Sequence, residues 1–382
     1  MLNILLEATF IWQNALSAQR GLIMHVYLRY RMFNEKYMER TMNLNITKLF
    51  CTGIVLLTSF GCPQAIASDA MELKTKEVDF VNQNVNRPAK IKFWYQGGAE
   101  PCEATICLSP KQSSHRVAII SHGAFGSPRE MNWLGYALAS QGWVVAGVAH
   151  FGESWVYGAE NIDPSSAMRF WQRPQDVSFA IDSLSKEGLF NAALKTDKVI
   201  MLGHSSGGFT SLAMAGANLE AGKSEAYCAS GKAKHDKGCD YGQQSKRKPM
   251  TEEMLTKIGL LQEQMRDERV VAVITLDPAL GHAVSEQSLE SIKVPVLVIG
   301  SLENDFLPYR THSKYYANHI QGASLVGIEQ GAGHFVYIDK CDSDRAVKGV
   351  FLCKDREGVD RKATQKQILE HVFGFIYSNG FS

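Results

Sequence analysis

The chain has 382 residues, of which 45% are hydrophobic and 21% are charged. This composition is ordinary for a globular protein and excludes a disordered or fibrous chain. The formal net charge of +1 gives no electrostatic basis for binding nucleic acid or an anionic membrane surface, so neither is expected as a partner.

Residues 42–67 have the pattern of a cleaved signal peptide. Lys48 precedes an apolar run over 49–60, and Ala65-Ile66-Ala67 supplies the small residues of a cleavage site. The run is shorter than the roughly 20 apolar residues of a membrane-spanning helix, so no stable membrane insertion is expected after the signal is removed. The prediction is a periplasmic or secreted protein.

Met42 stands directly before this segment. Residues 1–41 are therefore interpreted as an over-extended leader, and a genuine leader is the alternative. The mature domain is expected over 68–382.

Six cysteines remain in the mature part, an even number that suits disulfides in an oxidising compartment. Zinc is the alternative, but no pair has C-x-x-C spacing or a well-placed histidine beside it. Sequence alone does not fix the connectivity, and the simplest pairing joins neighbours: Cys102 with Cys107, Cys228 with Cys239, and Cys341 with Cys353.

Strand and helix patterns alternate along the mature chain. Strands are expected within 77–97 (two, EVDFV and AKIKFWY), at 117–120, 143–150, 199–202, 269–277, 294–301 and 323–330, and helices at 129–140, 173–186, after 205, and at 364–377. The strand at 117–120 is continuously apolar, which is typical of a central parallel strand covered on both faces. The pattern predicts an α/β fold with a mostly parallel central sheet and helices on both faces.

Residues 218–250 interrupt this alternation with a polar, basic segment that contains two cysteines. They are expected to form a small insertion between the helix after residue 205 and the next core strand. Two interpretations stay open: a partial cap over the active site, or a solvated excursion closed by one disulfide.

Gly203-His204-Ser205-Ser206-Gly207 matches G-x-S-x-G, placed between an apolar strand and a helix. That setting is the nucleophile elbow, in which a sharp turn lifts the serine above the sheet. Glycines on both sides of the turn relieve its crowding. Ser205 is therefore the predicted nucleophile, and an unreactive serine in a sharp turn is the alternative.

A serine hydroxyl needs a neighbouring base, and this chain order supplies the acid and then the histidine after the serine. His334 lies in GAGHF, a glycine-rich loop after the last strand, and is the predicted base. Asp305 follows the penultimate strand and is the predicted acid. Asp277 ends the preceding strand and is the alternative acid.

The oxyanion of acyl transfer needs preorganised N–H donors. The backbone N–H of Ser206, directly after the nucleophile, is the first predicted donor. The second is expected from the loop after 117–120, at Ala124, with Phe125 as the alternative.

These residues resemble a known group, the secreted, dienelactone-hydrolase-like α/β hydrolases related to platelet-activating-factor acetylhydrolase. The resemblance runs through KIKFWYQG, ISHGAFGS, GWVVAGVAH, RPQDVSFAIDSL, GHSSGG, VVAVITLDPAL, VPVLVIGSLEND, GAGHF and the Cys341–Cys353 stretch. It implies the α/β-hydrolase fold, a serine nucleophile, and no metal or organic cofactor. The sequence departs from the family pattern in two places. Dienelactone hydrolases have a cysteine where Ser205 stands, so lactone specificity is not implied. The acetylhydrolases take their acid from the position of Asp277, whereas Asp305 occupies the other usual position of the acid.

The sequence therefore predicts an exported serine hydrolase that cleaves carboxylic esters through Ser205, His334 and Asp305. Short-chain acyl esters, lipid acetyl esters and polyesters are the expected substrates. An amidase or peptidase with the same triad and a non-catalytic hydrolase-fold binding protein are the alternatives.

Overall fold

The central feature is one sheet of eight strands, in the order β1-β2-β4-β3-β5-β6-β7-β8. In this computed structural model the described residues are 72–98, 102–110, 112, 115–239 and 252–381. The predicted leader, the predicted signal peptide and residues 240–250 of the predicted insertion lie outside them. The strands are β1 (Glu72–Asn82), β2 (Arg87–Gly97), β3 (Arg116–Ser121), β4 (Val144–Ala149), β5 (Lys195–His204), β6 (Val270–Leu276), β7 (Val296–Ser301) and β8 (Ser324–Ile328).

The strand directions confirm the predicted α/β class. β1 and β2 form an antiparallel hairpin, and β2 pairs antiparallel with β4. All the pairs from β4 through β3, β5, β6 and β7 to β8 are parallel. β4 and β7 are buried along their whole length, as expected for strands covered on both faces, whereas the edge strand β1 is largely half-exposed or exposed.

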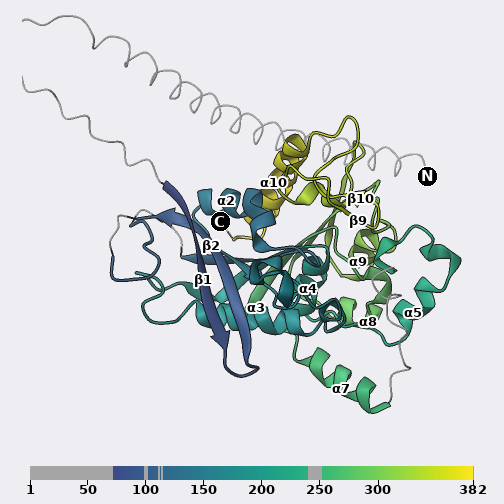
Figure 1. Cartoon of the computed structure of the whole chain (residues 1–382), viewed down its shortest axis with the longest axis horizontal. Coiled ribbons are helices and arrows are strands. Elements are labelled where there is room, and N and C mark those ends of the chain that lie inside the picture. Colours follow the sequence, from purple (N-terminus) through teal and green to yellow (C-terminus); the bar gives the residue numbers. More distant parts are fainter. Residues whose placement is uncertain (1–71, 99–101, 111, 113–114, 240–251, 382) are drawn as a thin grey trace, which may run out of the picture. The chain divides into compact units, whose positions relative to one another are not determined.

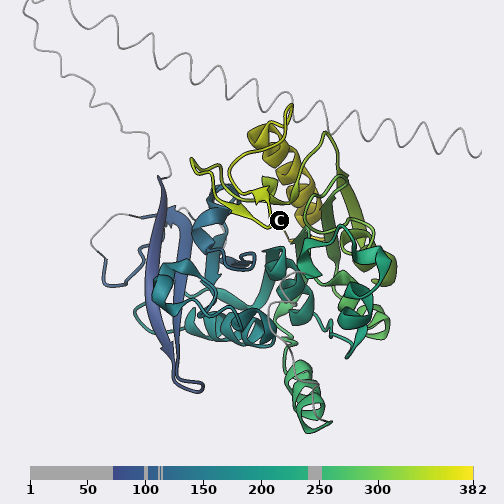
Figure 2. The same ribbon diagram turned by 45° about the vertical axis from the view of Figure 1, so that its right-hand side comes forward.

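Helices cover both faces of the sheet (Figures 1 and 2). The helices of the described residues are α2 (Asn132–Ser140), α3 (Gln172–Ser183), α4 (Ser206–Met214), α5 (Lys223–Cys228), α7 (Glu252–Glu263), α8 (Glu286–Glu290), α9 (Ser313–His319) and α10 (Arg361–Ser378), of which α7 projects away from the sheet. One apolar cluster joins the sheet to α3, α4, α8 and α9, and a second joins its other face to α2 and α10. Among the described residues, no helix has the length and hydrophobicity to cross a membrane.

The described part of the insertion, 218–239, contains the short helix α5 and two 3-10 turns. Its Cys228–Cys239 disulfide is present, and the N–H of Lys237 donates to the carbonyl oxygen of Phe306 at 2.9 Å. The insertion is thereby attached to the loop that follows β7.

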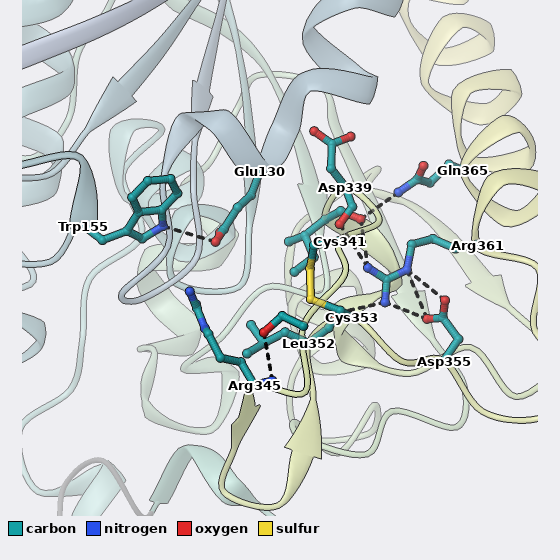
Figure 3. The surroundings of a disulfide bond; sticks show 12 residues. Glu130, Trp155, Asp339, Cys341, Arg345, Leu352, Cys353, Asp355, Arg361 and Gln365 are labelled. Atoms are coloured by element: carbon teal, nitrogen blue, oxygen red, sulfur yellow. Dashed lines mark hydrogen bonds and ion pairs between the residues drawn. A yellow bond between two sulfur atoms is a disulfide. The ribbon is translucent and has the colours of Figure 1, made fainter.

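All three predicted disulfides are confirmed. Cys341–Cys353 closes a loop containing a small hairpin that was not predicted, β9 (Ala346–Val347) and β10 (Val350–Phe351). Figure 3 shows how Arg361, at the start of α10, anchors this loop. Its guanidinium pairs with Asp355 at 2.8 Å and also donates to the carbonyl oxygen of Leu352 at 2.8 Å.

Candidate active site

Ser205 occupies a strained turn between β5 and α4. Its φ of 57° and ψ of −119° lie in a region that side chains other than glycine rarely adopt. A Cβ atom added at Gly203 would lie 2.0 Å from the carbonyl oxygen of Gly207, and one added at Gly207 would lie 2.0 Å from that of Ser121. Glycine is therefore required on both sides, because Gly203 packs directly against the first turn of α4 and Gly207 packs directly against the end of β3.

His334 stands at the start of the 3-10 turn His334–Tyr337, after β8. Its Nε2 atom lies 3.0 Å from the Oγ atom of Ser205. The Phe306 ring stacks on the imidazole at 5.2 Å between centroids and 12° between planes. His204 donates from Nε2 to the carbonyl oxygen of His334 at 3.0 Å, so both the ring and the backbone of the histidine are fixed.

The structure separates the two candidate acids. Oδ2 of Asp277 lies 3.4 Å from Nδ1 of His334, and its other oxygen accepts a hydrogen bond from the N–H of Ser301 at 2.8 Å. Asp305 instead accepts from the backbone N–H of His334 at 2.9 Å and pairs with Arg356 at 3.3 Å. The carboxylate beside the imidazole ring is thus that of Asp277, not that of the predicted Asp305, which holds the backbone of the same histidine.

Burial has the largest effect on the pKa values of both His334 and Asp277. It lowers the pKa of the His334 imidazole to about 3, against the attraction of the Asp305 carboxylate. Burial likewise raises the pKa of the Asp277 carboxyl to about 8, although the Ser301 N–H opposes it. A neutral imidazole with Nε2 facing a hydroxyl can accept its proton.

The loop after β3 packs against the nucleophile. A Cβ atom added at Gly123 would lie 3.4 Å from Cβ of Ser205. Ala124 and Phe125 follow in a half-buried turn, with Phe125 at a φ of 54°. Ser206 begins α4, where the first N–H groups have no partner within the helix. Ser206, and Ala124 or Phe125, stay predictions as oxyanion donors.

Two residues that the sequence analysis did not single out hold this loop. Arg173, in α3, donates to the carbonyl oxygens of His122 at 2.9 Å and Gly123 at 3.3 Å. Its guanidinium also pairs with Glu153 at 2.8 Å, and both side chains are buried. Arg173 opens the RPQDVSFAIDSL motif, but the motif gives no sign of its partner, because Glu153 lies 20 positions earlier and only the fold brings the two buried charges together.

Comparison with known proteins bears on the fold. No family model matches the sequence, and no curated protein matches it. Among 504 matching solved chains, the ferulic acid esterase from Streptomyces cinnamoneus has a TM-score of 0.51 and 17% sequence identity. The similarity covers 81% of this chain and 91% of the esterase. The chain has the α/β-hydrolase fold. At this identity the similarity shows the fold alone, and the resemblance to dienelactone-hydrolase-like proteins stays a prediction from the sequence.

Proposed function

We propose that the chain is an exported serine hydrolase that cleaves carboxylic esters. The observation that carries this proposal is the 3.0 Å contact between Oγ of Ser205 and Nε2 of His334 at a strained strand–turn–helix junction. The three disulfides support export, because such bonds persist in oxidising compartments. The structurally similar ferulic acid esterase makes an ester the first substrate to test.

In this mechanism Ser205 attacks the ester carbonyl while His334 takes the hydroxyl proton at Nε2. Asp277 faces Nδ1 of the same imidazole, where it holds the ring. The positive charge of the imidazolium, as it forms, lowers the pKa of this buried carboxyl, so that Asp277 stabilises the imidazolium as the carboxylate. The N–H groups of Ser206 and Ala124 receive the oxyanion. His334 then returns the proton to the leaving alcohol, and water releases the acid from the acyl-enzyme by the same steps.

The test is turnover of p-nitrophenyl esters from acetate to palmitate, together with a ferulate ester and a p-nitroanilide of matched acyl chain. Ser205→Ala is expected to lower kcat by about 10⁴-fold or more, because no other hydroxyl takes the place of the nucleophile. The matched control is Ser140→Ala, an exposed serine at the end of α2, which should retain wild-type turnover.

Ester turnover retained by a folded Ser205→Ala variant would remove the proposed mechanism. Hydrolysis of the anilide at a rate comparable with the ester would instead assign the site to amide substrates.

A further inference from the structure

A second cluster of ionisable side chains lies outside the triad. It consists of Asp236 in the insertion, His282 in the 3-10 turn Gly281–Ala283 after β6, and His312 immediately before α9. These residues are 4%, 8% and 1% exposed, respectively. One ligand atom from each lies within 4.8 Å of the other two.

The two imidazoles direct nitrogen atoms at the Asp236 carboxylate. Nε2 of His312 lies 2.7 Å from Oδ2, and Nδ1 of His282 lies 3.7 Å from the same oxygen. The His282 ring is held by stacking on Tyr227, with 4.1 Å between centroids and 17° between planes. Its Nδ1 atom is buried and has no hydrogen-bond partner among the described residues. A buried, unpartnered nitrogen aimed at a carboxylate is unfavourable unless a ligand completes the group.

We propose that Asp236, His282 and His312 bind one divalent transition-metal ion of the zinc type. Two imidazole nitrogens and a carboxylate oxygen form a common donor set for this ion, with a water molecule as the fourth ligand. Zinc–ligand bonds of about 2.0–2.1 Å in tetrahedral geometry separate the ligand atoms by roughly 3.3 Å. The two distances to the carboxylate oxygen, 2.7 and 3.7 Å, lie on either side of that value, and all three ligand atoms lie within 4.8 Å of one another. Small side-chain shifts would therefore bring the three atoms around one ion.

Metal binding changes one proton position in this cluster. Nδ1 of His312 faces the N–H of Gly281 at 3.4 Å, so Nε2 carries the imidazole proton in the arrangement described here. An ion at Nε2 moves that proton to Nδ1, so the 3.4 Å contact with Gly281 is lost and the 2.7 Å hydrogen bond to Asp236 is replaced by coordination of both groups to the ion. The positive charge of the ion would also compensate the negative charge of the buried Asp236 carboxylate.

The surroundings place Asp236 at the wall of a cavity and give the ion a structural role. A cavity of about 570 Å³ reaches Asp236 and is also lined by the Cys228–Cys239 disulfide, Asn304 and Asp305. The three ligands come from three separate segments, so the ion would fasten the insertion to the loops that follow β6 and β7. This inference does not depend on the proposed esterase activity.

The test uses the purified, oxidised chain after removal of metals with dipicolinate. Titration calorimetry with Zn²⁺ alone is expected to give one site per chain, with a Kd in the micromolar range or tighter. Excess Zn²⁺ should raise the Tm by a few degrees, because the ion binds only the folded state. His282→Ala and His312→Ala should each weaken binding about 100-fold or more, as loss of one of three ligands requires. The matched control is His235→Ala, an exposed histidine beside Asp236, which should leave the Kd unchanged.

The absence of saturable Zn²⁺ binding to the wild-type chain would overturn the proposal. An unchanged Kd in His282→Ala would also overturn it, because the ion would then lie elsewhere. If an alanine variant does not fold in metal-free buffer, His282→Gln replaces it. The visible spectrum of Co²⁺ bound to wild-type chain tests the same point without a variant: tetrahedral bands support the site, and a purely octahedral spectrum contradicts it.

Discussion

At the scale of single residues, two carboxylates act on different parts of one histidine. Asp277 is fully buried beside the His334 ring, whereas the Asp305 side chain is 25% exposed and binds the backbone N–H. In a serine hydrolase the carboxylate beside the ring selects the tautomer and stabilises the imidazolium. We therefore assign Asp277 as the triad acid within the proposed mechanism, in place of the predicted Asp305.

The two acids can be distinguished by paired substitutions. Asp277→Asn is expected to lower kcat by about 10⁴-fold, because the amide favours the wrong imidazole tautomer. Asp305→Asn should lower it about tenfold or less, because the side-chain amide oxygen still accepts from the His334 N–H. The measurement is p-nitrophenyl ester turnover at pH 7, with thermal unfolding as the control for folding. The reverse order of losses would restore Asp305 as the acid.

At the scale of elements, a buried ion pair ties α3 to the loop after β3. Arg173 reaches the carbonyl oxygens of His122 and Gly123 while it pairs with Glu153. The predicted oxyanion donor Ala124 is the next residue in that loop. Arg173 thus acts on the proposed reaction as a positioning residue, through the backbone that it holds.

Removing one member of this pair leaves the other charge buried. Arg173→Met is expected to destabilise the fold by about 3–5 kcal/mol, and the Arg173→Met, Glu153→Gln double variant by less. Because the carbonyl contacts stay lost, the double variant should still show kcat at least tenfold lower with KM nearly unchanged. The control is Arg169→Met, which removes an exposed ion pair with Asp163 of small stabilising effect. Wild-type kcat in the double variant would contradict the positioning role.

The disulfides act on the stability of the loops they close. Cys341 and Cys353 are separated by 12 positions, and loop-closure entropy predicts about 3 kcal/mol of stabilisation for such a bond. The Cys341→Ser, Cys353→Ser variant should therefore lower the urea midpoint at neutral pH. The shorter Cys102–Cys107 loop is the comparison and should have the smaller effect, about 2 kcal/mol. Equal midpoints for wild type and the Cys341–Cys353 variant would refute this stabilisation.

At the scale of the whole molecule, buried histidines dominate the response to acid. Burial lowers the pKa of five imidazoles below the ordinary 6.5: those of His122, His150, His204, His282 and His334. Four carboxyls among the described residues have the opposite effect. Burial raises the pKa of Asp176 to about 6 and that of Asp277 to about 8, and it also raises the pKa of Glu130 and of Asp339. These five histidines outnumber the four carboxyls, so unfolding near pH 5 takes up protons.

The free energy of unfolding is therefore expected to fall as the pH drops from 6.5 towards 4. In that range the unfolded state carries protons that the buried imidazoles lack, and each net proton contributes about 1.4 kcal/mol per pH unit. Urea unfolding at pH 7, 6, 5 and 4.5 measures this slope. The control is His235→Gln, which replaces an exposed histidine and should leave the slope unaltered. A stability that stays level down to pH 4.5 would show that these imidazoles are protonated in the folded state.

The strand and helix order follows from local patterns in the sequence, because burial on both faces demands continuous apolar runs. The nucleophile elbow is also predictable from a local pattern, because only glycines at positions 203 and 207 avoid overlap with neighbouring backbone atoms. The hairpin at β9 and β10 was not predicted, because its two-residue strands are too short to produce an alternating pattern.

The sequence by itself determined the alternating α/β order, the turn that presents Ser205 and the three neighbouring cysteine pairs, all of which depend on residues close together in the chain. Only the tertiary structure decided which aspartate faces the His334 ring, which residues hold the loop after β3, and that Asp236, His282 and His312 meet. Asp277 and Asp305 follow adjacent parallel strands, which lie only about 4.8 Å apart. The choice between them therefore depends on differences smaller than the length of a side chain, which packing sets and chain order does not.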